Sequence, residues 1–250
     1  MWAMSIDLLC RIADAEARAH VRFGAGGQVA RFGPLVAVSA AGTGDAPLPL
    51  DTGWLSSERP PTESELADFE AFSARQGQAA TLHLLSPQAP AALPLLTGRG
   101  YTLDFVLHAY AHDLKKRPPL QGVPVREVSD PEGWATLAAE GFGPGTEAVM
   151  RAVGQAAGTR LFVAEVDGQA AATGAVHLQG GIAALHGTAT RPACRGRGAQ
   201  TALLAHRLQW AAQAGADLAT VFVTPGSPSE RNVMRAGFRL VGMRLTFTRR

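Results

Sequence analysis

A basic turn punctuated by glycines leads into a helix in the second half of the chain, and its residue types suit the binding of an anion. Arg195 and Arg197 alternate with Gly196 and Gly198, after an apolar segment that ends at Thr190. The glycines permit a tight turn and a close approach of the backbone to a ligand, and the first N–H groups of the helix lack intrahelical partners. These donors and the positive end of the helix dipole favour a phosphate or pyrophosphate. The alternative is a plain connection between a strand and a helix.

Two common nucleotide-binding motifs do not fit this turn. A P-loop ends in Gly-Lys-Ser or Gly-Lys-Thr, which the segment lacks. A Rossmann fingerprint has a third glycine and an acidic residue about 20 residues further on. Here the third glycine is missing, and the next acid is Asp217, directly before the next predicted strand. The sequence therefore favours a different phosphate-bearing ligand.

The turn resembles the pyrophosphate loop of the GNAT superfamily of acyl-CoA-dependent N-acyltransferases, which reads Gln/Arg-x-x-Gly-x-Gly/Ala. Residues 195–200 resemble that loop up to the last place, where Gln200 replaces the usual glycine or alanine. This departure is tolerable if Gln200 contributes only its N–H, because a longer side chain on a first helical turn can point outward. Residues 228–238, which include Asn232, resemble a second signature of the family, an asparagine-containing helix that ends in Gly-Phe. The resemblance covers the chain from about residue 123 to residue 250.

The resemblance implies acetyl-CoA as the acyl donor and no metal. The cofactor's pantetheine arm is expected to lie along strand 182–190, where separation from the next strand makes room. Backbone N–H groups there would polarise the thioester carbonyl, as in an oxyanion hole. The cofactor-binding residues that it implies are Thr188, Ala189, Thr190, Arg195, Gly196, Arg197, Gly198, Ala199, Gln200, Thr201, Thr224 and Asn232. For Thr188 and Thr190 simple β-propensity is the alternative explanation, and for Asn232 it is helix capping.

Direct transfer of an acetyl group to an amine requires a base for the amine, and two residues are candidates. His186 precedes Thr188 and Thr190 at even spacing, so strand alternation predicts the three side chains on one face. A neutral imidazole accepts a proton directly or through water. Glu140 ends the first helix of the resembling region, where the family's acceptor groove usually forms. The alternatives are a half-buried sheet histidine and an exposed acid at a helix end.

The leaving thiolate requires a proton donor, and here the sequence departs from the family. Many members donate the proton from a tyrosine, but Val233 stands at that position. The chain has two tyrosines, Tyr101 and Tyr110, and both precede the predicted C-terminal domain. Ser229 or water is left as the acid, and loss of a general acid typically costs about 10²- to 10⁴-fold in rate. Cys194 adjoins the loop, but direct transfer requires no acyl-enzyme and favours a packing role for it.

The elements that must position these residues alternate along the second half of the chain. Hairpins followed by a strand–helix–strand crossover predict an α/β (α+β) fold, with a central mixed, mostly antiparallel sheet flanked by helices. Asp167-Gly168 predicts a two-residue hairpin turn. We expect strands at 123–128, 160–166, 170–178, 182–190, 218–224 and 238–248, and helices at 130–141, 146–154, 198–214 and 229–235.

The first half repeats the later part of this order without the glycine turn. We expect a helix at 62–76, a strand at 81–85, a short helix at 90–97 and a long strand to residue 113. The prolines of segment 56–61 lack the N–H groups that a pyrophosphate requires. We therefore predict two tandem GNAT-like domains, a degenerate one at 1–117 and a catalytic one at 118–250, joined by a linker at 115–119. An unrelated α/β half is the alternative.

Composition limits the partners. A net charge of +2 with 18% charged residues gives no case for nucleic acid. Two cysteines favour a reducing compartment, and no apolar run predicts a membrane span or signal peptide, so we expect a cytoplasmic protein. The acceptor is expected to be a small-molecule or peptide amine, and the protein a monomer or homodimer. The alternatives to an enzyme are a non-catalytic acyl-CoA-binding module or regulator, and an interaction scaffold whose loop binds anions adventitiously.

Overall fold

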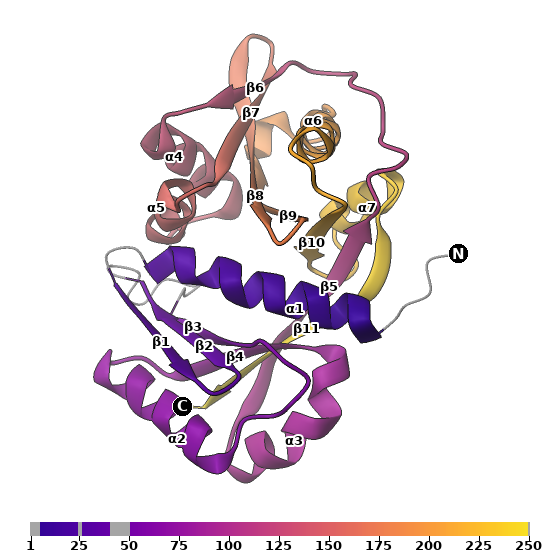
Figure 1. The fold of residues 1–250 in the computed structure, drawn as a ribbon. Coiled ribbons are helices and arrows are strands. Elements are labelled where there is room, and N and C mark those ends of the chain that lie inside the picture. The colour runs from indigo at the N-terminus through magenta and orange to yellow at the C-terminus, as the bar shows by residue number, and fades with distance from the viewer. Residues whose placement is uncertain (1–5, 25–26, 41–50, 250) are drawn as a thin grey trace. The chain divides into compact units, whose positions relative to one another are not determined.

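The structure, a computed structural model, describes residues 6–24, 27–40 and 51–249 (Figure 1). These residues form two compact units, each with its own hydrophobic core. Unit 1 comprises the described residues up to Ala109 together with 241–249, and unit 2 comprises 110–240.

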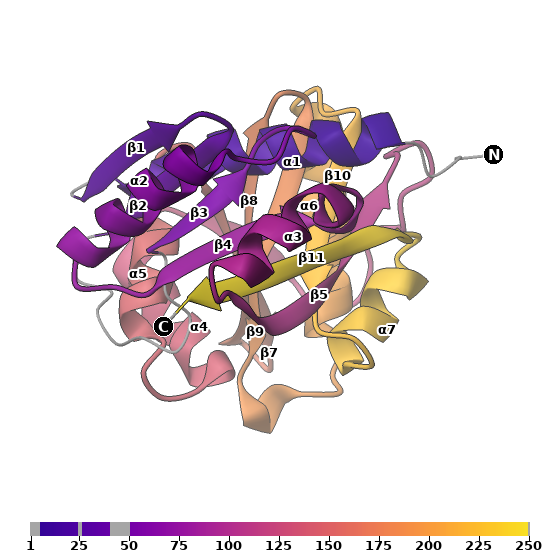
Figure 2. The same cartoon turned by 90° about the horizontal axis from the view of Figure 1, so that it is seen from below.

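Unit 1 is a sheet with helices on both faces. Its strand order is β1-β2-β3-β4-β11-β5, in which β3 and β4 run parallel and β4 and β11 run antiparallel. Helix α1 lies on one face and helices α2 and α3 on the other (Figures 1 and 2). The strands are β1 (Gln28–Phe32), β2 (Leu35–Ser39), β3 (Thr52–Leu55), β4 (Ala80–Leu85), β5 (Thr102–His112) and β11 (Arg239–Arg249), and the helices are α1 (Ile6–His20), η1 (Val21–Gly24), α2 (Glu63–Arg75), η2 (Ser86–Gln88) and α3 (Ala89–Gly98). Of β5 and β11, residues 110–112 and 239–240 are counted with unit 2.

Unit 2 is a mixed sheet with the strand order β10-β9-β8-β7-β6. Strands β9 and β10 run parallel, and the other three pairs run antiparallel. Helix α6 covers one face and helices α4 and α5 cover the other (Figure 1). The strands are β6 (Val125–Val128), β7 (Arg160–Val166), β8 (Gln169–Gln179), β9 (Ile182–Thr190) and β10 (Leu218–Val223), and the helices are α4 (Pro131–Phe142), α5 (Glu147–Gln155), η3 (Pro192–Cys194), α6 (Ala199–Gln213) and α7 (Pro228–Arg235).

Local sequence explains where the elements of unit 2 begin and turn. The side chain of Asp130 caps α4 by accepting from Gly133 N at 3.0 Å, and Ser227 caps α7 by accepting from Glu230 N at 3.1 Å. Asp167 and Gly168 have φ values of 54° and 74°, the left-handed conformation that a two-residue hairpin turn requires. The core lies between the sheet and α6.

The predicted fold class is confirmed, and the elements predicted from residue 62 onward lie within a few residues of those observed. For residues before 56 the sequence yielded no elements, whereas the structure has α1 and β1 to β3 there. No helix in the described part of the chain is long and apolar enough to cross a membrane.

The predicted domain division at 117/118 differs from the division in the structure. Unit 2 already begins at Tyr110, so the predicted linker at 115–119 lies inside it. The last strand of the C-terminal domain was predicted at 238–248, but the residues from 241 onward belong to unit 1, where β11 pairs with β4 from Arg244↔Leu85 to Arg249↔Ala80. Local patterns predicted the strand but not the unit that it joins, because strand pairing is decided by tertiary structure.

Candidate functional site

The glycine turn of unit 2 leaves the start of α6 open to a ligand. Gly196 and Gly198 have φ values of 77° and 83°, and a Cβ added at either would meet nothing within 4 Å. Gly198 is the N-cap of α6 and provides no side-chain cap, and the first turn of the helix holds no acidic residue. The N–H groups and the positive end of the helix dipole are therefore not neutralised by the protein's own side chains.

Two arginines flank this turn, each held by the protein. Arg195 is exposed and donates from Nη2 to Gly141 O at 3.3 Å. Arg197 forms two parallel hydrogen bonds to the carboxylate of Asp167, at 2.6 and 2.7 Å. This pair holds the pKa of Asp167 below its usual value. A phosphate at the turn would compete with Asp167 for the Arg197 guanidinium, because both offer oxygen pairs to the same fork.

The side chain of Gln200 is turned toward α7 and does not point outward. Its Nε2 donates to Ser229 Oγ at 2.6 Å, and its Oε1 accepts from Asn232 Nδ2 at 2.5 Å. Asn232 Oδ1 in turn accepts from Arg235. The structure thus brings together three residues predicted separately, and the longer side chain at the family's glycine position ties the first turn of α6 to α7. Of the other predicted residues, Ala199 is buried, whereas Thr201 and Thr224 are exposed.

Strand β9, which feeds the turn, contains a β-bulge. Thr173 pairs with Ala189 and Ala175 pairs with His186, so Gly174 of β8 faces two residues of β9, Gly187 and Thr188. Gly187 has a φ of 58°, and its carbonyl accepts from Thr173 Oγ1 at 3.1 Å. Bulges redirect side chains and interrupt the regular ladder, and they are frequent near functional sites.

The strands β9 and β10 separate beyond this point. Their parallel pairing runs from Ile182↔Leu218 to Leu185↔Val221, although β9 continues to Thr190 and β10 to Val223. The backbone of β9 from His186 onward therefore has no ladder partner on β10. This separation was expected from the resemblance.

The bulge overturns one prediction, that His186, Thr188 and Thr190 share a face. Thr190 pairs with Ala172, which belongs to the core beneath α6, whereas His186 pairs with Ala175 on the opposite face of β8. Paired residues on neighbouring strands lie on the same face, so the extra residue in β9 moves His186 and Thr190 to opposite faces. His186 is half-buried, and its Nδ1 lies 3.1 Å from Ala184 O.

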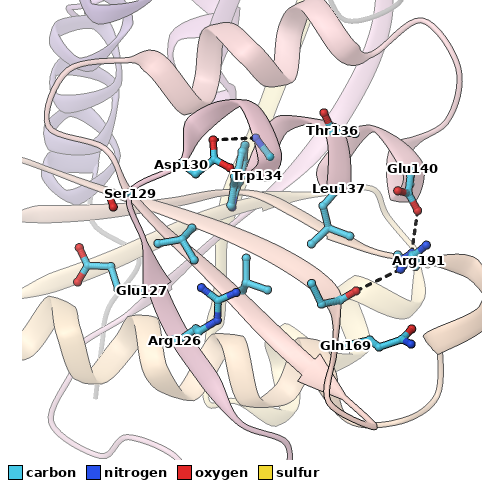
Figure 3. A pocket seen from close by; sticks show the side chains of 14 residues that line it. Arg126, Glu127, Ser129, Asp130, Trp134, Thr136, Leu137, Glu140, Gln169 and Arg191 are labelled. Atoms are coloured by element: carbon cyan, nitrogen blue, oxygen red, sulfur yellow. Dashed lines mark hydrogen bonds and ion pairs between the residues drawn. The ribbon is translucent and has the colours of Figure 1, made fainter.

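Glu140 is paired with Arg191 and not with His186. Its Oε2 lies 2.7 Å from Arg191 Nε, and both side chains are roughly two-fifths exposed, at 45% and 39%. The pair lines an open pocket of about 820 Å³ (Figure 3). The pocket's other lining residues come mainly from α4, β6, β7 and β8. His186 is not among the residues that line this pocket.

Cys194, at the end of η3, is half-buried and packs against the core of unit 2. This position agrees with its predicted packing role.

Tyr110 is a buried side chain of unit 2 that sequence analysis assigned to the other domain. Its hydroxyl donates to Glu230 Oε1 at 2.9 Å, and Gly226 N donates to Glu230 Oε2 at 2.6 Å. Burial, together with the Glu230 carboxylate, raises the pKa of Tyr110 to about 12. Unit 2 therefore does contain a tyrosine, a protonated one directed at a carboxylate on α7. The sequence-based prediction missed this tyrosine because the boundary at 117/118 placed Tyr110 in the N-terminal domain.

Unit 1 has a similar strand–helix junction, but its helix is capped by its own side chains. The N–H of Thr62 donates to Glu65 Oε2 at 2.8 Å, and Glu65 N donates to Thr62 Oγ1 at 3.3 Å. Arg59 binds the same carboxylate at 2.8 and 2.9 Å, and this contact lowers the pKa of Glu65 to about 2. The Thr62-x-x-Glu65 spacing is a capping-box signal that sequence analysis missed. The Glu65 carboxylate therefore lies at the N-terminus of α2, where a bound anion would otherwise lie.

Comparisons with known proteins agree with this geometry. Residues 132–238 match the model of a family described as the acetyltransferase (GNAT) family. No curated protein matches the chain significantly.

Solved structures share the fold. A GCN5-related N-acetyltransferase from Kribbella flavida is 19% identical, with a TM-score of 0.75 over 98% of this chain and 96% of that one. A second, from Sphaerobacter thermophilus, is 18% identical, with a TM-score of 0.58 over 79% and 71%. A tandem GNAT protein from the clavulanic acid biosynthesis pathway is 16% identical, with a TM-score of 0.53 over 74% and 68%.

Proposed function

We propose that this chain is an N-acetyltransferase of the GNAT superfamily that transfers the acetyl group of acetyl-CoA directly to the primary amine of a small-molecule or peptide acceptor. The observation that carries the proposal is the order of structural elements from β9 to α6 in unit 2. A bulged strand parts from its parallel neighbour and feeds a glycine turn at an uncapped helix start. The family match over residues 132–238 supports acyl transfer from an acyl-CoA.

In the proposed reaction the amine nitrogen attacks the thioester carbonyl carbon. The C–N bond forms, the C–S bond breaks, and the sulfur leaves with the electron pair as the thiolate of coenzyme A. The amine proton passes to a base, for which His186 on β9 is the proposed residue, directly or through water. The thiolate takes a proton from Ser229 or water. Since Ser229 Oγ accepts from Gln200, its own hydroxyl proton is not used in that contact.

We propose a single cofactor site for each chain, with unit 1 as a degenerate copy of the same unit. Each unit contains a parallel strand pair joined through a helix, β3–α2–β4 and β9–α6–β10. The Glu65 carboxylate at the start of α2 would repel a pyrophosphate, whereas α6 has no such group. The two-cysteine composition supports a cytoplasmic location.

A second candidate function is an acyl-CoA-binding module without catalysis. It is favoured by Val233, which stands where many members of the resembling family have the tyrosine acid. The hydroxyl of Tyr110, the tyrosine that unit 2 does contain, already donates to Glu230.

Two measurements on the full chain separate these candidates. Calorimetric titration with acetyl-CoA is expected to give one site per chain. Release of free thiol from acetyl-CoA is then followed with a panel of primary amines, for the wild-type protein and for His186→Gln. Turnover with at least one amine, reduced about 10²-fold or more in His186→Gln, supports the enzyme. Binding without turnover across the panel supports the module, and absence of binding contradicts both.

A further inference from the structure

Arg207, on α6, is a fully buried arginine of unit 2, with an exposed fraction of 0%. Among the described residues no carboxylate contacts it, and its buried Nη2 makes no hydrogen bond. Burial lowers the pKa of the guanidinium to about 9, so it remains a cation at neutral pH. A buried charge without a counter-charge is costly and persists only where polar groups compensate it.

The groups that compensate it lie at the bulge of β9. Arg207 Nη1 donates to Ala175 O at 3.2 Å and to His186 O at 3.3 Å, the carbonyls of a residue pair that borders the bulge. Its Nε donates to Leu203 O of its own helix at 3.2 Å. Gly174 makes room for this arrangement, because a Cβ there would lie 2.9 Å from the guanidinium carbon. The guanidinium therefore fills the gap where the ladder between β8 and β9 is interrupted.

We propose that Arg207 is a positioning residue for acyl transfer, which fixes the His186–Gly187 peptide at the bulge and places a positive charge behind the strand that receives the thioester. The inference rests on the proposed function. C=O and N–H of a trans peptide point in opposite directions, so holding His186 O toward α6 turns the Gly187 N–H away from α6. Negative charge develops on the thioester oxygen as the amine attacks, and a fixed cation in a low-dielectric interior stabilises it.

The test reads the polarisation of the bound thioester directly and does not depend on knowing the acceptor. Acetyl-CoA labelled with ¹³C at the carbonyl is bound to the full chain, and its carbonyl stretch is recorded by difference infrared spectroscopy. We expect the band of the wild-type complex to lie below that of free acetyl-CoA. Arg207→Gln keeps an N–H donor but removes the charge, and should reduce this displacement. Arg207→Lys keeps the charge and should restore most of it.

Kinetics with an amine that the thiol-release panel identifies give the second readout. Arg207→Gln is expected to lower kcat about 10²-fold while KM for acetyl-CoA changes little, as for loss of one oxyanion-stabilising group. Equal impairment of the lysine and glutamine variants would assign Arg207 to packing alone and overturn the inference, as would an unchanged band in Arg207→Gln.

Gly174→Ala covers the case in which Arg207→Gln does not fold. The added methyl displaces the guanidinium while the charge remains, so a smaller band displacement supports the inference and an unchanged one refutes it. Failure of the wild-type protein to bind acetyl-CoA refutes the proposed function and this inference together. If acetyl-CoA binds but its carbonyl band is the same in the wild-type protein and in the variants, only the inference about Arg207 is refuted.

Discussion

At the scale of single residues, the availability of a loop arginine for binding an anion depends on the carboxylate with which it is already paired. Arg197 is bound by Asp167, and its exposed pair is worth little to stability, because water screens it. The same pair bears on the proposed binding of a phosphate, which would compete with the carboxylate for the guanidinium. Arg59 of unit 1 binds Glu65 in a comparable way, but there the carboxylate also caps the helix. Both pairs join an arginine to a carboxylate, but only Glu65 also caps a helix, so only the start of α2 is closed to an anion.

Replacing Gly198 by alanine should weaken acetyl-CoA binding by tenfold or more. Its Cβ would occupy the open space at the start of α6 where the pyrophosphate is proposed to bind. Gly215, just after the other end of the same helix, has the same φ of 83° and also has nothing within 4 Å of an added Cβ. Both variants should lose about 1 to 2 kcal/mol of stability, the usual cost of a left-handed alanine.

Calorimetry and thermal unfolding of Gly198→Ala and Gly215→Ala therefore separate backbone strain from ligand contact. Equal affinities for acetyl-CoA in the two variants would contradict the location of the site.

At the scale of elements, the bulge in β9 decides which face each side chain of the candidate site occupies. Sequence analysis predicted β9 to the residue and still placed His186, Thr188 and Thr190 wrongly, because one inserted residue reverses alternation. No local pattern marks the bulge except Gly187, whose φ of 58° suits glycine. In contrast, turns rich in glycine and proline and recognisable caps allowed most later elements to be predicted.

The bulge should be intolerant of a side chain at Gly187. An added Cβ would lie 2.6 Å from Cη2 of Trp134, which is buried and donates to Phe162 O at 3.2 Å. Gly187→Ala is expected to lose about 3 kcal/mol or more, from left-handed strain and overpacking together. Gly180, at the turn before the same strand, has a φ of 56° with nothing within 4 Å of an added Cβ, and Gly180→Ala should lose only the strain.

Urea unfolding of the two proteins measures this difference. Similar midpoints for Gly187→Ala and Gly180→Ala would mean that Trp134 moves aside and that the bulge is not sterically fixed.

At the scale of the whole molecule, two buried histidines make the stability of unit 1 dependent on pH. Unit 1 holds His20 and His83 buried, with His20 Nε2 at 3.0 Å from Thr52 O and His83 Nδ1 at 2.9 Å from Thr246 Oγ1. Burial lowers the pKa of His20 to about 4 and that of His83 well below its usual value. Arg244 adds to both shifts.

Unit 1 should therefore lose stability in mild acid. A histidine with a depressed pKa contributes fully above its unfolded pKa of 6.5, and its contribution falls as the pH drops toward 4, since the unfolded chain takes the proton first. For His20 this amounts to about 3 kcal/mol by pH 4. The glutamine of His20→Gln cannot be protonated, so the free energy of unfolding of this variant should depend less steeply on pH. Urea unfolding from pH 8 to pH 4.5 measures it, and parallel curves for the two proteins would contradict the assignment.

Strand β11 gives the chain an unusual order of assembly during synthesis. Unit 1 holds most of the residues made first, yet its sheet requires residues 241–249 beside β4. A ribosome must therefore translate all of unit 2 before the first unit has its full set of strands. Until then the edge of β4 that pairs with β11 lacks this partner, and exposed edges invite pairing with other chains. Unit 1, most of which is translated before unit 2, therefore completes its sheet only after unit 2 has been made.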